Sequence, residues 1–312
     1  MKNLIAAAML LLLLQIGLSL FFHIGRKGVE TGAPDSLFLD FAPDAVHSIK
    51  ITDGEGKNVL LVKEKETWIV PAHFSAPVDA NKVEALLDNL AGMKQGLVVA
   101  TSVEAAKRFK VDSESFENHV LLRRAEQTLA DFYVGTSPAF RQVYARRAES
   151  KAIITIPLPG FELESGVDKW LDTSLAMQKD DDLVGLIFDT FTLKKEADGW
   201  QLEGRKDDEQ INRQEVDALV TRARGLVVQD VLDPAAVSGL FTGQPLLHFT
   251  AVRKDKKLVE YLFAQGQGDF SVLKLSDRDL YLKVHTLPVE ALRKVTREKL
   301  LEPAQSEEPS VE

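Results

Sequence analysis

Short apolar runs separated by turn-forming residues cover most of the chain from residue 41 onward. Apolar positions between residues 46 and 51 precede a turn at residues 53–57, and a second apolar run follows at residues 59–62. After a charged turn comes a third run, Trp68 to Val70. β-Prone runs bounded by turn residues predict antiparallel hairpins. The first part of the body therefore opens with strands.

A helical pattern follows this group of strands. Asp79 can cap a helix start by accepting hydrogen bonds from free backbone N–H groups. The apolar positions after it recur at i, i+3, i+4 and i+7, namely Val83, Leu86, Leu87 and Leu90. This spacing places them on one helix face. We therefore expect an amphipathic helix with one buried face, followed by a strand at residues 97–100.

The same order of elements returns in the second half of the chain. Trp200 corresponds to Trp68, and Asn212 corresponds to Asp79. The apolar positions of the second helical pattern are Val216, Leu219, Val220 and Ala223. The Gly-Leu-Val-Val strands that begin at Gly96 and Gly225 correspond in the same way, at nearly the same offset. Such a long period indicates domain duplication and not a solenoid.

The predicted fold is α+β, with two tandem copies of an antiparallel sheet with a packed helix. Strands at residues 129–134 and 152–156 correspond to strands at residues 258–263 and 281–285. Each copy closes with a helix-like piece, Val167 to Met177 and Val289 to Leu301. The copies span residues 41–178 and 179–301, and residues 302–312 form a disordered tail. Side-by-side cores and one continuous sheet both remain open.

The N-terminus carries a long apolar run, Leu4 to Ile24. At about 1.5 Å per residue it matches a bilayer core of roughly 30 Å. A cleaved signal peptide is the alternative, but its apolar region is about 7 to 15 residues long and precedes a small-x-small cleavage site. Neither feature is present here. We predict a transmembrane signal anchor at residues 1–27 and a linker at residues 28–40.

The charges beside the run leave its orientation nearly tied, with Lys2 on one side and Arg26 and Lys27 on the other. The default for a short N-terminal tail is an internal N-terminus. The expected location is therefore the inner, cytoplasmic membrane, with a single span and the body in the periplasm or extracytoplasmic space. The lipid contact is then made by residues 4–24.

Three polar residues, Gln15, Ser19 and His23, interrupt the run at i, i+4 and i+8 and share one helix face. Such a stripe can bind a second membrane helix. The alternative is that a single-span anchor tolerates a few mild polar residues.

Composition narrows the classes of partner and of chemistry. The chain has 312 residues, a net charge of -9 and no cysteine. Binding a polyanion depends on basic groups that displace counterions, so an acidic chain argues against a nucleic-acid partner. Without cysteine there is no disulfide, thiolate zinc site or iron–sulfur cluster. An acidic surface mainly supports solubility.

No spacing typical of a catalytic, cofactor or metal site stands out. The six histidines are scattered, and the acidic runs at residues 180–182 and 207–209 lack the pattern of a calcium loop. The segment at residues 54–57 precedes a strand and not a helix, unlike a phosphate loop. There is no Gly-x-Ser-x-Gly elbow. We expect no catalytic residues, no cofactor and no metal.

Two groups of residues nevertheless suggest binding. A basic group, consisting of Arg123, Arg124, Arg141, Arg146 and Arg147, can face anionic lipid or an acidic partner. Its alternative is the solvated side of a sheet. Trp68 and Trp200 can line a ligand groove, but equivalent positions in two copies favour equivalent core residues.

The order of these elements resembles the domain-of-unknown-function family 4340. The residues that carry the resemblance are Ile49-Lys-Ile51, Trp68, Pro77-Val-Asp79, Val83 to Leu90 and Leu97-Val-Val-Ala100, with weaker counterparts at Trp200, Asn212 and Val216 to Val220. The resemblance implies a membrane-anchored exported bacterial protein. It also implies genes beside those of gliding-motility-type ABC transport components. It supplies no catalytic residues.

The expected function is a membrane-anchored periplasmic binding or scaffold protein, non-catalytic and accessory to an ABC-type transport or envelope system. Its partner would be a membrane or periplasmic protein. Two alternatives remain open at this point. One is an envelope hydrolase or transferase assembled from distant residues. The other is a sensor that binds a small ligand between the two copies.

Overall fold

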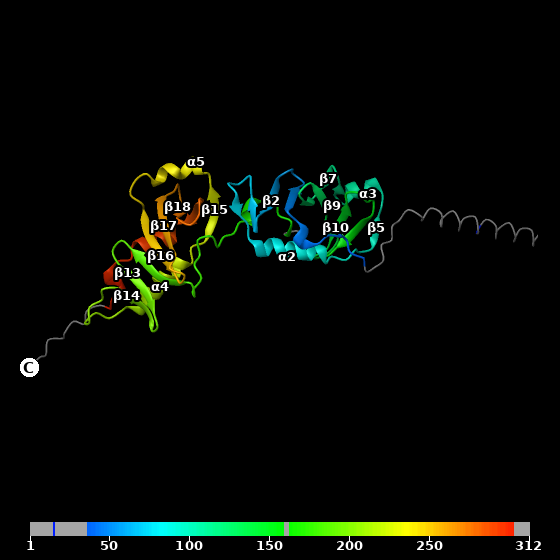
Figure 1. Cartoon of the computed structure of the whole chain (residues 1–312). Helices are drawn as coiled ribbons and strands as arrows, with labels where there is room; N and C mark the ends of the chain where they lie inside the picture. Colours follow the sequence, from blue (N-terminus) through cyan, green and yellow to red (C-terminus); the bar gives the residue numbers. More distant parts are fainter. Residues whose placement is uncertain (1–14, 16–35, 159–161, 303–312) are drawn as a thin grey trace, which may run out of the picture. The chain divides into compact units, whose positions relative to one another are not determined.

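The computed structural model of the chain describes residue 15 and residues 36–158 and 162–302 (Figure 1). Contacts between Cα atoms divide the chain into two compact units. Unit 1 contains the chain up to Glu66 and Asn81–Lys169, and unit 2 contains Thr67–Ala80 and the chain from Trp170. Both units consist mostly of antiparallel sheet with a few helices, so the predicted α+β class is confirmed.

The predicted membrane anchor lies outside the described residues. Of the polar stripe, only Gln15 is described, in helical conformation, and Ser19 and His23 are not. None of the helices that the structure describes is long and apolar enough to cross a bilayer. The predicted tail also lies outside them, from residue 303 onward.

Unit 1 is built on one large sheet. Its strands are β1 (Ser48–Asp53), β2 (Asn58–Glu64), β5 (Val98–Ala100), β8 (Asn118–Arg124), β9 (Gln127–Val134), β10 (Val143–Arg147) and β11 (Ile153–Ile156). They follow the order β2-β1-β8-β9-β10-β11-β5. A small hairpin is formed by β6 (Val111–Asp112) and β7 (Ser115–Phe116). The helices are α2 (Ala80–Ala91) and α3 (Val103–Arg108), with 3-10 turns η1 (Pro43–Ala45) and η3 (Val167–Lys169).

Unit 2 contains a second large sheet and the hairpin of β3 (Thr67–Val70) and β4 (Ala76–Pro77). The sheet strands are β12 (Leu183–Phe188), β13 (Thr192–Glu196), β14 (Gly199–Leu202), β15 (Val228–Leu232), β16 (Leu247–Arg253), β17 (Leu258–Gln265), β18 (Phe270–Leu275) and β19 (Tyr281–His285). The helices are α4 (Arg213–Arg224), α5 (Pro234–Val237) and α6 (Thr286–Arg293), with 3-10 turns η4 (Ser238–Phe241) and η5 (Arg297–Leu300).

The two sheets have matching strand orders. In unit 1 the order is β2-β1-β8-β9-β10-β11-β5, and in unit 2 it is β14-β13-β12-β16-β17-β18-β19-β15, in which β13 to β15 repeat the unit 1 order. In each, the strand that follows the long helix, β5 or β15, pairs with the last strand of the sheet, β11 or β19. The connections therefore follow one pattern, as expected for two versions of one folding unit.

The predicted helix faces are buried as expected. In α2 the buried side chains are Val83, Leu86, Leu87 and Leu90, and in α4 they are Val216, Leu219, Val220 and Ala223. Asn212 caps α4, since its side chain accepts a hydrogen bond from the Glu215 backbone N–H at 3.2 Å. On the strands, Ile51 and its cross-strand partner Val120 are both fully buried. The alternation of apolar residues thus sets which sheet face is the core.

Three local predictions are wrong. The piece from Val167 to Met177 is helical only over Val167–Lys169, because the backbone beyond it bonds to other segments, such as Val228 N–H to the Thr173 carbonyl at 2.9 Å. Residues 225–227 precede β15 and are not part of a strand. Trp200 is only half-buried, while Trp68 is buried. The largest fully buried side chain of the described residues is Trp170. It has no equivalent tryptophan in the second copy of the repeat.

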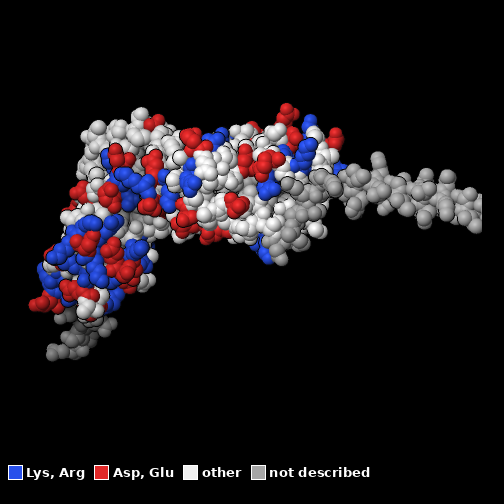
Figure 2. Space-filling view, turned by 45° about the vertical axis from the view of Figure 1, so that its right-hand side comes forward, with Lys and Arg blue, Asp and Glu red and all other residues white. Residues whose placement is uncertain are grey.

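Basic and acidic side chains are intermixed where they gather on the face that Figure 2 draws. The acidic excess of the chain is not gathered into one patch on that face. Intermixed charges support solubility and do not by themselves indicate a binding site.

A bidentate ion pair holds the last described segment of unit 2. The Arg297 guanidinium donates to both carboxylate oxygens of Glu209, at 3.0 and 2.7 Å. Its second terminal nitrogen also donates to the Gly204 carbonyl at 3.1 Å. The Arg297 hydrogen bonds, with one from the Lys206 backbone N–H, lower the pKa of Glu209 to about 2. Paired donors make this kind of contact geometrically specific.

This ion pair predicts a pH dependence. A carboxylate whose pKa is depressed on folding stabilises the protein above its unfolded pKa of 4.5, and this contribution is lost as pH falls toward about 2. Glu209→Gln should therefore flatten the fall of the urea unfolding midpoint over this pH range. The matched control is Glu66→Gln, because the Glu66 side chain is 93% exposed. Equal pH profiles for Glu209→Gln and the unsubstituted chain would contradict the assignment.

Candidate functional site

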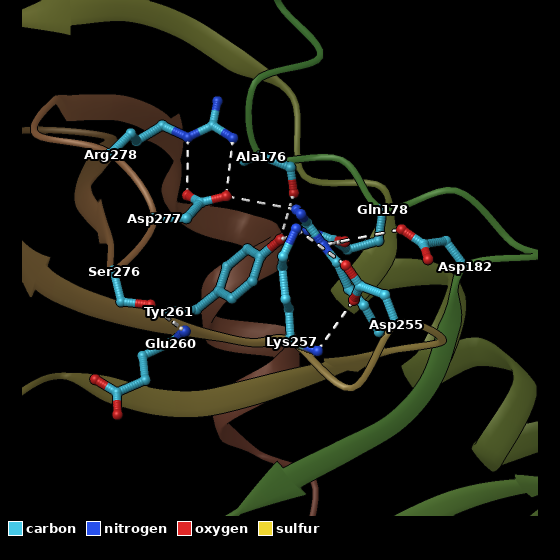
Figure 3. A network of polar contacts seen from close by, with 11 residues as sticks. Ala176, Gln178, Asp182, Asp255, Lys257, Glu260, Tyr261, Ser276, Asp277 and Arg278 are labelled. Carbon is cyan, nitrogen blue, oxygen red and sulfur yellow. Dashed lines mark hydrogen bonds and ion pairs between the residues drawn. The ribbon is translucent and has the colours of Figure 1, made fainter.

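The described part of unit 2 contains a polar network around a buried tyrosine (Figure 3). The Tyr261 hydroxyl donates to the Ala176 carbonyl at 2.9 Å and accepts from the Gln178 amide at 2.5 Å. Arg253 donates to the Gln178 side-chain carbonyl at 3.0 Å. Asp277 accepts two hydrogen bonds from Arg278, at 3.0 and 3.2 Å, and lies 3.5 Å from Arg253.

These groups satisfy one another, which indicates a structural role. Burial raises the pKa of Tyr261, so its hydroxyl stays protonated and neutral. The Arg278 guanidinium lowers the pKa of Asp277, which stays ionised between two arginines. The network ties the segment around Ala176 to strand β17. It therefore stabilises the fold of unit 2.

The predicted basic group does not form one surface. Arg146 points inward, with its Nε donating to the Val111 carbonyl at 2.7 Å and its guanidinium 5.0 Å from the centre of the Tyr133 ring. Arg147 pairs with Glu149 at 3.3 Å. Arg124 donates to Gln127 at 2.9 Å, and Arg123 is exposed at the end of β8. Arg141 lies apart from the others, in the loop before β10.

A histidine–aspartate pair lies on the polar side of the unit 1 sheet. His119 Nε2 lies 2.7 Å from Asp131 Oδ1, and the imidazole stacks on the Tyr133 ring at 4.5 Å. Only cross-strand pairing brings these residues together, so their spacing in the sequence gives no signal. Over residues 36–158 and 162–302, no group of three His, Asp or Glu side chains is placed to hold a metal ion.

A cleft of about 880 Å³ lies at one end of the sheet in unit 1, and we call it the sheet-end cleft. It is lined by Asn89, residues 92–96, Arg141, Gln142, residues 155–157 and Glu162. These come from the end of α2, the loop before β5, the loop before β10 and the end of β11. Arg141 and Gln142 also line a second cleft of about 570 Å³.

A glycine shapes the wall of this cleft. A Cβ at Gly96 would lie 2.1 Å from the Thr155 carbonyl oxygen, closer than any side chain can approach. Gly96 thus lets the loop before β5 run directly against β11. In unit 1, this close packing explains why the Gly-Leu-Val-Val sequence begins with glycine.

Glu162 places an unsatisfied acceptor in the cleft wall. Its Oε2 is buried and has no hydrogen-bond partner among the described residues. Burial raises the pKa of Glu162, while Arg141 and a hydrogen bond from Asn89 oppose that shift. A buried acceptor without a partner is costly and indicates a missing donor, which water or a bound group can supply.

A tight turn presents Phe140 and Arg141 between the two clefts. The Gln142 N–H donates to the Ala139 carbonyl at 3.1 Å, so Phe140 and Arg141 are the central residues of a four-residue turn. The Ser137 hydroxyl lies 2.7 Å from the carbonyl oxygens of Ala139 and Gln142. Arg141 has a φ of 56°, a conformation that favours glycine. We call residues 139–142 the Phe140–Arg141 turn.

Two side chains beside the sheet-end cleft are the most exposed large apolar groups of the described residues. Phe140 is 90% exposed and Leu97 is 81% exposed. Each is a direct neighbour in sequence of a residue that lines the cleft, Arg141 and Gly96 respectively. Isolated apolar side chains on a surface are ordinary, but two beside one cleft indicate an interaction surface.

Reasoning from sequence identified only Arg141 of these residues. Phe140 lies in a Ser-Pro-Ala-Phe-Arg loop between two strands, and an aromatic residue in a polar loop was the available signal. Leu97 was expected within a strand, and β5 begins one residue later. Glu162 had no signal, since its burial depends on contacts with distant segments.

Comparison with known proteins identifies a family and no individual relative. The model of a family described as a domain of unknown function (DUF4340) matches residues 68–240. No curated protein and no solved structure is similar enough to the chain to count as a match.

The buried network predicts a specific cost for removing one hydroxyl. Tyr261→Phe leaves the Gln178 amide and the Ala176 carbonyl without their partner, and should lower the free energy of unfolding by about 1–3 kcal/mol. Urea unfolding of the full chain in detergent measures it. The matched control is Tyr144→Phe, since Tyr144 is half-buried in unit 1. A Tyr261→Phe protein as stable as the control would contradict the role of the network.

The Phe140–Arg141 turn predicts a substitution that stabilises. Arg141→Gly removes the Cβ from a residue with positive φ, and should raise the free energy of unfolding by about 1 kcal/mol. Ala139→Gly is the control, because Ala139 is not among the residues with positive φ and gains only flexibility. Urea unfolding compares the two variants. A loss of stability in Arg141→Gly would show that the turn is not strained at this residue.

Proposed function

Since the chain belongs to the domain-of-unknown-function family DUF4340, we propose that it is a membrane-tethered, non-catalytic protein that binds a polypeptide partner. The partner is a membrane protein of an ABC-type transport or envelope system. The single observation that carries the proposal is the sheet-end cleft of about 880 Å³ in unit 1, whose lining residues Arg141 and Gly96 adjoin the exposed Phe140 and Leu97 in sequence.

The lining of the cleft fits a segment of polypeptide. Uncharged hydrogen-bonding side chains, Asn89, Gln95 and Gln142, alternate with apolar ones such as Met93 and Ile156. Backbone groups of a partner can bond to the former, while Met93 and Ile156 are buried beneath the surface of the cleft. The unsatisfied Glu162 oxygen accepts one N–H of the bound segment.

The tether and the location rest on the N-terminal apolar run, Leu4 to Ile24. Its length suits one membrane span, and the default orientation for a short N-terminal tail puts the body outside the cytoplasm. The chemistry of the partner follows from the family resemblance, which links such proteins to gliding-motility-type ABC transport components. A tether raises the effective concentration of the cleft at the membrane where that partner lies.

The duplicated pattern fits a scaffold better than an enzyme. Two units with the same order of strands arise most simply from duplication of one folding unit. In unit 2, the polar groups around Tyr261 stabilise the fold. In unit 1, the corresponding layout carries an open cleft. We assign partner binding to unit 1 and support to unit 2.

Photo-crosslinking in cells tests the proposal. A photoreactive phenylalanine replaces Gln95, which lines the cleft, in the full chain. The expected product is a covalent adduct with one integral membrane protein, identified by mass spectrometry as an ABC-type transport component. Filling the cleft with Gln142→Trp should reduce that adduct severalfold, because the bound segment loses its space.

The control places the same photoreactive residue at Leu258, an exposed apolar position of unit 2. For the substitution, Leu258→Trp controls for added surface bulk. No adduct at Gln95, or the same adducts at both positions, would overturn the proposal.

A further inference from the structure

We propose that the Phe140–Arg141 turn, together with Leu97, docks on the surface of an anionic lipid bilayer. The inference rests on the membrane tether of the proposed function and adds a second, reversible contact made by unit 1. That contact would hold the sheet-end cleft at the membrane surface, where the partner is reached.

The side chains at this surface combine the features of an interfacial contact. Phe140 is an almost fully exposed aromatic group at the tip of a turn, and Leu97 is nearly as exposed. Arg141 and Lys94, both exposed, belong to the lining of the same cleft. Aromatic and aliphatic side chains enter the boundary between headgroups and acyl chains, while basic side chains bind anionic headgroups.

Acidic side chains at the two clefts also contribute to the charge of this surface. Glu162 lines it, and Glu117 lines the neighbouring cleft. Glu162 Oε2 is buried in the wall, whereas Arg141 and Lys94 are exposed. Glu117 pairs with Lys110 at 2.5 Å. Arg141, the residue next to Phe140, is therefore an exposed basic side chain beside a buried carboxylate oxygen.

The backbone conformation of the turn indicates that the arginine at position 141 has a functional role. Its φ of 56° would suit glycine or asparagine, and an arginine there is strained. Other hairpin turns of the chain carry the same conformation at Lys65 and Ala125. Among these described turns, only at Arg141 does the strained residue adjoin a nearly fully exposed aromatic side chain and line two clefts.

The course of the chain places this surface near the membrane. The Gln95 N–H donates to the Ser36 carbonyl, and the Phe38 N–H donates to the Met93 carbonyl, each at 2.8 Å. The chain thus enters unit 1 along the wall of the cleft. Residues 25–35 separate this point from the end of the apolar run, and they span at most about 40 Å. The basic residues Arg26 and Lys27 follow the run.

A lipid surface fits better than a strand added by a protein partner. β5 is the end strand of its sheet but is only three residues long, and its pairing with β11 contains an irregularity. Short and irregular edge strands discourage strand addition. Phe140 projects from a turn, which suits insertion between headgroups.

Spin labelling of the full chain tests the inference, because the chain has no cysteine of its own. A nitroxide is attached to Ala139→Cys, which leaves Phe140 and Arg141 in place. The protein is reconstituted into vesicles of equal parts phosphatidylglycerol and phosphatidylcholine, or of phosphatidylcholine alone. The ratio of oxygen to nickel-complex accessibility measures whether the label lies in the bilayer.

The expected ratio is several times higher in the anionic vesicles than that of a label at Leu258→Cys in unit 2. Added Phe140→Ser should lower it to the Leu258 value. Arg141→Gln should lower it in the anionic vesicles, while Arg141→Lys should retain it. Circular dichroism of each variant confirms that it is folded.

Three outcomes would overturn the inference. The first is an Ala139 label as water-accessible as the control in both vesicle types. The second is a label shielded from oxygen and nickel alike only when the crosslinked partner is present, which assigns the turn to a protein contact. The third is failure of the chain to float with the vesicles, which removes the tether itself. Loss of the Gln95 adduct with the accessibility ratio retained would overturn the proposed function alone.

Discussion

Each unit depends on one contact, the apolar face of a single amphipathic helix against the inner face of an antiparallel sheet. The helix repeats its side chains every 3.6 residues and the strand every two, so both must expose apolar groups toward one layer. In α2 and α4 the four inward positions are buried, as are Ile49 and Ile51 of β1. One face of each sheet therefore packs in the core. Polar side chains and the ends of the strands are left to make the contacts outside the core.

The two units differ in the contacts that these polar side chains and strand ends make. In unit 2, Tyr261, Gln178 and Arg253 bond to one another around a fully buried phenol, so the segment before β12 is held by groups that are all satisfied. In unit 1, the end of the sheet stays open beside Gly96, and one Glu162 oxygen has no partner within the part of the chain that the structure describes. The same order of strands can thus support a rigid polar plug or an open cleft, depending on a few side chains.

The proposed role follows from where the unsatisfied features gather. A cleft, an acceptor without a donor, a turn with a strained arginine and two exposed apolar side chains all lie at one end of unit 1. The chain enters the unit along the wall of that cleft, at Ser36. A tethered module that meets lipid with its turn and a polypeptide with its cleft accounts for these features together.

The sequence by itself determined the α+β class, the buried helix faces and the cap at Asn212, because they depend on local spacing and on turn residues. It also suggested the family, which the match to residues 68–240 shows. The tertiary structure decided which of the candidate site residues lie close together. It turned Arg146 inward and left Arg141 at a cleft, and it exposed Leu97 where the repeated Gly-Leu-Val-Val predicted a strand. Burial, pairing across strands and the ends of a sheet depend on residues far apart in the chain, and no spacing encodes them.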